Sequence, residues 1–260
     1  MIGKIKHIIV IESLNTLKTG EALYNDVIER RIKYYQPDND KMTHRFFNPK
    51  TKNDFIEVLN YIIFNSNNMQ GGLLIHLEMH GSNDLDGLIL ADDSLIGWTE
   101  LTDLFRQINI KMCNKLFITM ATCFGRHLYK GGNAELKSAY SGYISASNQI
   151  DVEDVRRDFT ILFEALIESR NIVESYLNLE KKGTIFFYKD SLGVFEDSFK
   201  STLAKMKADP KIKQDILKIA VEESIKAGEP IADEKMKDFL FELALKNTYK
   251  QHKDAYVFDC

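Results

Sequence analysis

GGLLIHLEMHG, at residues 71–81, is the stretch on which the fold assignment depends. Its apolar run lies between Gly71–Gly72 and Gly81, and this pattern is typical of a buried strand. Its histidines follow the order HxExH, whereas a metalloprotease helix needs HExxH, with the glutamate immediately after the first histidine. We therefore expect a strand in which His76 is a hydrogen-bonded core residue. We expect no metal ion and no cofactor.

Strand-like and helix-like segments alternate on both sides of this stretch. Short apolar runs predict further strands at residues 7–14, 43–48, 115–121, 141–147 and 184–188. Helical spacing of apolar residues predicts helices at 17–35, 51–66, 99–109 and 152–169. Residues 82–98 carry two short apolar runs around Asp92 and Asp93, which predict a hairpin, and Thr99 is the expected N-cap of the next helix.

This alternation predicts the architecture. Over residues 1–190 we expect an α/β fold of three layers, in which helices flank a mostly parallel sheet of about six strands. From Asp190 onward the pattern is helical only. Residues 191–260 are therefore predicted to form a helical C-terminal extension that packs on the first domain and regulates it.

Composition and charge limit the partners and the location. The chain has 260 residues, with 34 basic and 38 acidic side chains interspersed along it, and this gives a net charge of −4. We do not expect the protein to bind nucleic acid, because the interspersed charges offer no run of basic residues for a phosphate backbone. The apolar runs are too short for a membrane span, and the N-terminus lacks the pattern of a signal peptide. We expect a cytoplasmic protein that does not bind a membrane. We expect its three cysteines to form neither a disulfide framework nor a CxxC metal site.

Two reactive residues are predicted at the same edge of the sheet. Open parallel sheets gather their functional groups at the carboxyl ends of the strands. His80 ends the strand of residues 71–79, and Cys123 follows the strand of residues 115–121. If these strands are neighbours, their backbones run about 4.8 Å apart, which brings the imidazole within reach of the thiol. The pattern predicts a Cys–His dyad.

Each residue of this dyad has a chemical role. Cys123 is the predicted nucleophile, and His80 is the predicted base that raises its thiolate fraction or takes its proton during attack. Gly81 lacks a side chain where a substrate carbonyl must approach the backbone, and its N–H group together with that of Cys123 is predicted to form an oxyanion hole. Gly125 is expected to permit a sharp turn after the cysteine.

These residues resemble a known family. A hydrophobic strand ending in His-Gly, LLIHLEMHG, and a later strand ending in cysteine, LFITMATCFG, are similar to the caspase-like superfamily of cysteine peptidases, which includes caspases, metacaspases and CHAT-domain proteases. The resemblance covers about residues 5–190. It implies a protein or peptide substrate, a covalent thioester intermediate and control by an activating small molecule or a partner protein. Bacterial members are often toxic effectors of antiviral or stress-response systems.

The resemblance also implies where the substrate is recognised. Around the nucleophile the chain reads MATCFG rather than Gln-Ala-Cys-X-Gly, and this difference argues against cleavage after aspartate. In the superfamily, residues after the next strand line the pocket for the side chain that precedes the cut bond. They correspond here to Ser145, Ser147, Asn148, Asp151 and Asp154. Two carboxylates there would favour a basic residue, although DVED at 151–154 also suits the first turn of a helix.

Other interpretations remain open at this point. The fold could be a catalytically silent module that senses a ligand or binds a partner. A metal-dependent hydrolase that uses His76 and His80 is a further alternative. Either the segment 82–98 or the helical region 190–260 could keep the substrate groove closed until a signal binds.

Overall fold

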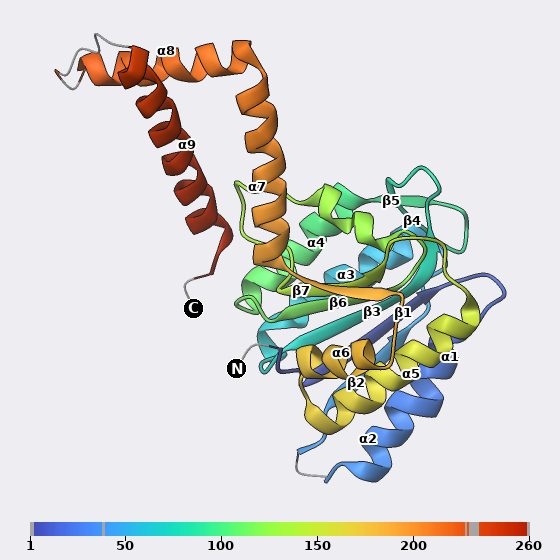
Figure 1. Ribbon diagram of the computed structural model, residues 1–260. Helices are drawn as coiled ribbons and strands as arrows, with labels where there is room; N and C mark the ends of the chain where they lie inside the picture. The colour runs from blue at the N-terminus through green and yellow to red at the C-terminus, as the bar shows by residue number, and fades with distance from the viewer. Residues whose placement is uncertain (1–2, 38–39, 227, 229–233, 259–260) are drawn as a thin grey trace. The chain divides into compact units, whose positions relative to one another are not determined.

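The computed structural model describes residues 3–37, 40–226, 228 and 234–258 (Figure 1). The chain divides into two compact units. The first contains Met1–Gly132, Ser138–Ser191 and Cys260, and the second contains Asn133–Lys137 and Leu192–Asp259. None of the helices in the described ranges is both long enough and apolar enough to cross a membrane.

The first unit is built on one sheet with the strand order β2-β1-β3-β6-β7-β8. The strands of this path are β1 (His7–Ser13), β2 (Thr43–Phe47), β3 (Leu73–Gly81), β6 (Leu116–Ala121), β7 (Gly142–Ala146) and β8 (Phe186–Asp190). All neighbours pair in parallel except β7 and β8, which are antiparallel. The predicted hairpin is β4 (Gly87–Ile89) and β5 (Leu95–Gly97), and it extends from the end of β3. The expected α/β fold with a mostly parallel sheet is confirmed.

Helices cover both faces of this sheet (Figure 1). One face carries α1 (Thr19–Leu23), the π-helix η1 (Tyr24–Glu29), α2 (Arg30–Tyr35), α5 (Val152–Ser169) and α6 (Ile172–Lys181). The other face carries α3 (Lys52–Asn65) and α4 (Trp98–Lys111), and the short 3-10 helices are η3 (Ser66–Asn68) and η4 (Gly125–Gly131). The core under α5 joins Phe159 and Phe163 to strand residues such as Leu74 and Phe117. Burial of these apolar side chains is the main favourable contribution to folding.

The second unit is helical. It contains α7 (Ser191–Ala208), α8 (Pro210–Lys226) and α9 (Glu234–Tyr256). Within it, the ring of Phe195 packs against those of Tyr249 and Tyr256, with centroids 5.7 and 5.1 Å away.

Some local predictions were wrong in their details. The segment 17–35 is not one α-helix, because η1 interrupts it with π-type turns between α1 and α2. Thr99 is not an N-cap: α4 begins at Trp98 and its N-cap is Gly97, because β5 leads directly into the helix. Helix α6 was not predicted. Its N-cap is Asn171, whose side chain accepts hydrogen bonds from the first turn.

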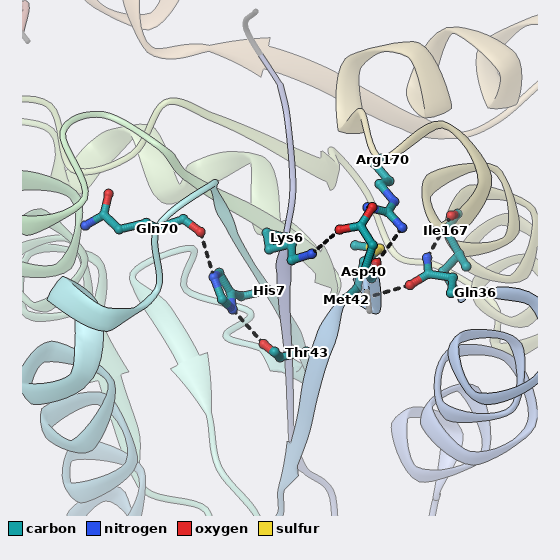
Figure 2. Close-up of polar contacts among 9 residues, drawn as sticks. All are labelled: Lys6, His7, Gln36, Asp40, Met42, Thr43, Gln70, Ile167 and Arg170. Carbon is teal, nitrogen blue, oxygen red and sulfur yellow. Dashed lines mark hydrogen bonds and ion pairs between the residues drawn. The ribbon is translucent and has the colours of Figure 1, made fainter. Parts of the chain in front are cut away.

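Polar side chains tie the chain together where β1 begins (Figure 2). The His7 ring bridges two segments, with Nδ1 2.6 Å from the Thr43 hydroxyl and Nε2 2.8 Å from the Gln70 carbonyl oxygen. Because a carbonyl only accepts, Nε2 donates to Gln70, and Nδ1 of the neutral ring accepts from Thr43. Nearby, the Arg170 guanidinium donates to the Asp40 carboxylate over 2.5 Å.

Candidate active site

Strands β3 and β6 are hydrogen-bonded neighbours, as the dyad requires. They run in parallel, and the last pair in register is Glu78 with Ala121. His80 lies two residues beyond Glu78 in β3, and Cys123 lies two residues beyond Ala121 in the turn that follows β6. No other strand separates these two strand ends in the sheet order. The structure thus brings the backbone positions of His80 and Cys123 to the same edge.

Gly81 is in direct contact with the backbone of Cys123. A Cβ atom on Gly81 would lie 1.8 Å from the Cys123 carbonyl oxygen, which is far inside any real contact distance. The expected reason for this glycine was an approaching substrate carbonyl. The structure gives a different reason, because the Cys123 carbonyl already occupies that space. Glycine is required here so that the two strand ends can approach each other.

The two reactive side chains are accessible and unpaired. The His80 side chain is exposed, and Cys123 is a half-buried free cysteine. Among the described residues, neither the imidazole of His80 nor the thiol of Cys123 has a hydrogen-bond partner, so the two do not bond to each other in this structure. Catalytic hydrogen bonds are often long or poorly aligned before substrate binds.

The turn after Cys123 differs from the expectation. Phe124, rather than Gly125, has the left-handed conformation, with φ of 58°, and its N–H group donates to the Asn148 carbonyl oxygen over 3.2 Å. Gly125 is needed for packing, because a Cβ atom there would lie 2.6 Å from Thr122 Oγ1 and 3.2 Å from the Cβ atom of Ser145. The turn therefore connects the candidate nucleophile to the loop after β7.

Three of the expected substrate-binding residues lie in or after β7. Ser145 is buried in the strand. Ser147 is half-buried, and its hydroxyl accepts a hydrogen bond from Arg126 Nη1 over 3.3 Å. Asn148 has an exposed side chain. Only Ser147 and Asn148 are thus accessible to a bound peptide.

The two expected carboxylates lie at the start of α5. Asp151 is the exposed N-cap residue, although its side chain makes no capping hydrogen bond. Asp154 forms an ion pair with Arg157, with 2.9 Å between Oδ1 and Nη2. Because an arginine already neutralises Asp154, it is a weaker partner for a basic substrate side chain than the sequence suggested.

His76 is a hydrogen-bonded core histidine, as predicted. Its ring is fully buried, with centroids 4.5 Å from Phe159 and 5.2 Å from Phe163. Nε2 lies 3.1 Å from Glu78 Oε1 and Nδ1 lies 2.8 Å from Thr119 Oγ1. Because a carboxylate only accepts, Nε2 carries the hydrogen of the bond to Glu78. In the described ranges, no group of three or more His, Cys, Asp or Glu side chains is placed to hold a metal ion.

A pair of buried glutamates beneath α1 was not predicted. Glu12, in β1, and Glu78, in β3, lie opposite each other in register, and both are almost fully buried. A Cβ atom on Gly20 would lie 2.9 Å from Glu78 Cγ and 3.2 Å from Glu12 Cβ, so this glycine packs on both side chains. Burial raises the pKa of Glu12 above its ordinary value, and the negative charge of Glu78 adds to the effect. The only sequence signal was a glutamate in each of two neighbouring apolar strands.

Glu78 also lines a pocket of about 360 Å³ between α1, η1 and α5. The pocket lies on the sheet face that carries His76, Glu78 and, by strand alternation, His80. Its walls combine apolar groups, such as Leu23, Val27 and Phe159, with polar ones, such as Thr19. A pocket of this size and mixed lining suits a small ligand or one large side chain.

No protein-family model matches the chain, and no curated protein shows significant similarity to it. The chemistry of the site is therefore inferred from its own residues. These are a free thiol and an exposed imidazole at adjacent strand ends, and a pocket lined by Glu78, which lies two residues before His80 in β3.

Proposed function

We propose that the chain is a cysteine endopeptidase in which Cys123 is the nucleophile and His80 is the general base and acid. The observation that carries this proposal is the parallel pairing of β3 with β6, together with the contact between Gly81 and the Cys123 backbone. A thiol and an imidazole at neighbouring strand ends are the minimum set for nucleophilic attack on a peptide carbonyl.

The proposed reaction has two stages. The Cys123 sulfur attacks the carbonyl carbon of the peptide bond, and its proton passes to the His80 imidazole. His80 then gives this proton to the departing amine, which leaves a thioester on Cys123. In the second stage water attacks the thioester, gives a proton to His80 and releases the acid product, while the proton returns to the thiol. The N–H groups of Gly81 and Cys123 are the proposed donors to the tetrahedral oxyanion.

The side-chain positions are compatible with this role. Adjacent strands lie about 4.8 Å apart, so the exposed His80 and the half-buried Cys123 extend from backbone segments that end close together. Neither side chain has to give up another hydrogen bond to contact the other. We extend the proposal to membership of the caspase-like superfamily and to the role of a regulated effector, on the basis of the His-Gly and cysteine strand ends.

Peptide-library cleavage, followed by mass spectrometry, tests the proposal. Wild type should cleave, whereas Cys123→Ala and His80→Ala should each lose about 10³-fold or more of the rate. The matched control is His252→Ala, which removes a histidine from α9 of the second unit and should cleave like wild type. Unchanged cleavage by Cys123→Ala would show that the nucleophile is elsewhere.

A catalytically silent module is the second candidate. It is favoured by the lack of a hydrogen bond between His80 and Cys123 in this structure. Iodoacetamide labelling separates the two functions, because a base-activated thiol reacts much faster near neutral pH than an ordinary one. For a peptidase, we expect His80→Ala to slow the labelling of Cys123 about tenfold, with His252→Ala as the control. Equal rates of Cys123 labelling in wild type and in His80→Ala would favour the silent module.

A further inference from the structure

The pocket lined by Glu78, two residues before His80 in β3, has an acidic floor that no lysine or arginine neutralises among the described residues. Glu78 Oε2 accepts from Thr19 Oγ1 over 2.5 Å, and Oε1 accepts from His76 over 3.1 Å. Each carboxylate oxygen has a second lone pair, so Glu78 retains capacity for two more donors. Among the described residues, no lysine or arginine forms an ion pair with Glu12 or Glu78.

Two neighbouring buried carboxylates without a cation are unfavourable for folding. Burial and the negative charge of Glu78 both oppose the ionisation of Glu12 and raise its pKa above the ordinary value. Such a pair is retained most easily where a positively charged ligand offsets the cost.

The walls of the pocket suit the stem of a long basic side chain. Leu23, Val27 and Phe159 provide apolar surface along which methylene groups can pack. At the rim, the exposed residues Asp26 and Arg156 carry opposite charges, so they largely cancel. The net charge that faces a ligand is therefore the carboxylate of Glu78, with Glu12 behind it.

The backbone of the pocket wall is also unusual. Val27 and Asp26 belong to η1, a π-helix between two α-helical segments. Single π-helical turns are rare, and they occur frequently at functional sites. This irregularity lies in the wall opposite α5, where a regular helix would present different side chains.

We propose that this pocket binds the positively charged side chain of the substrate residue whose carbonyl Cys123 attacks, with Glu78 as the anionic partner of that side chain. The inference rests on the proposed peptidase function. Glu78 lies two residues before His80 in β3, a separation of about 7 Å between their Cα atoms. An extended lysine or arginine side chain can span such a distance. Cleavage after lysine or arginine is therefore expected.

A binding test separates this inference from catalysis. It uses the full-length chain with Cys123→Ala, which lacks the proposed nucleophile, and agmatine, which carries a guanidinium group and no carboxylate. At ten times its dissociation constant, agmatine should raise the Tm by about 3 °C. Adding Glu78→Gln should abolish this rise. The matched control Glu57→Gln, at an exposed position of α3, should retain it.

A kinetic test uses wild type and peptides that differ only in the residue before the cut bond. Peptides with arginine or lysine should be preferred to the glutamine peptide, and Glu78→Gln should reduce this preference about tenfold or more. Ala22→Phe provides a second variant, because it fills the pocket without changing a charge and should also remove agmatine binding. Circular dichroism checks that each variant is folded.

The outcomes distinguish the two proposals. Cleavage without a preference for basic residues, together with no agmatine binding, would overturn the pocket inference and leave the peptidase. Agmatine binding that depends on Glu78, without any cleavage by wild type, would support the cationic site and overturn the peptidase. If agmatine raised the Tm of the Cys123→Ala variant equally with and without Glu78→Gln, this result would also overturn the inference.

Discussion

Gly81 of β3 lies directly against the carbonyl group of Cys123, in the turn after β6. A side chain on Gly81 would begin 1.8 Å from that oxygen, so the two backbones could not keep their positions. This close approach depends on the glycine alone. It allows the ends of β3 and β6, which pair in parallel, to bring the candidate catalytic residues to one edge.

The first prediction concerns this contact. Gly81→Ala should destabilise the protein by about 3 kcal/mol, because backbone atoms rather than a flexible side chain must move. Urea unfolding measures the change. Gly97→Ala is the control: a Cβ atom there would lie 3.7 Å from the Asp86 carbonyl oxygen, an ordinary contact, and the stability should change by about 0.5 kcal/mol or less. A small effect of Gly81→Ala would contradict the close approach.

The second prediction concerns the buried chain of hydrogen bonds through His76. His76→Leu leaves both Glu78 and Thr119 without one partner inside the core, and the expected cost is about 2–3 kcal/mol. Thr119→Val removes only one hydrogen bond and should cost about 1 kcal/mol. Chemical unfolding of the two variants checks this order. If Thr119→Val lowered the free energy of unfolding as much as His76→Leu, or more, His76 would be held by packing on Phe159 rather than by these hydrogen bonds.

The third prediction concerns pH. Burial lowers the pKa of His7 below its ordinary value of 6.5, so the folded state favours the neutral ring (Figure 2). Its contribution to stability is present above pH 6.5 and is lost as the pH falls through the pKa of the folded state. His7→Leu should therefore be less stable than wild type by about 1 kcal/mol at pH 8, and this gap should narrow at pH 5.5. Thermal unfolding at the two pH values tests this prediction. A difference in stability between wild type and His7→Leu that did not change with pH would argue against the neutral ring.

Much of the fold could be predicted because its signals are local. The helix predicted at 152–169 coincides with α5, and the helix predicted at 51–66 corresponds to α3. The predicted dyad required the strands now seen as β3 and β6 to be neighbours, and the strand order meets this condition. Pairing of His80 with Cys123 as a catalytic dyad stays a prediction, since the two side chains are not hydrogen-bonded in the structure.

What could not be predicted depends on contacts between distant segments. Glu12 and Glu78 become a pair only because β1 lies beside β3, and Gly20 can pack on both only because α1 crosses them. Neither residue is unusual within its own strand. Likewise, the role of Gly125 became clear only with the position of Ser145, because the crowding comes from another strand.

The fourth prediction follows from the buried glutamate pair. The pKa of Glu12 is raised above its ordinary value of 4.5, chiefly by burial, so its contribution to stability is present below pH 4.5 and is lost as the pH rises through the pKa of the folded state. Glu12→Gln should therefore raise the Tm at pH 8 by about 2–4 °C and change it little at pH 4. Gln still provides an oxygen that accepts from the Gly20 N–H group. Differential scanning calorimetry at both values tests this, and destabilisation at pH 8 would show that the Glu12 charge stabilises the fold.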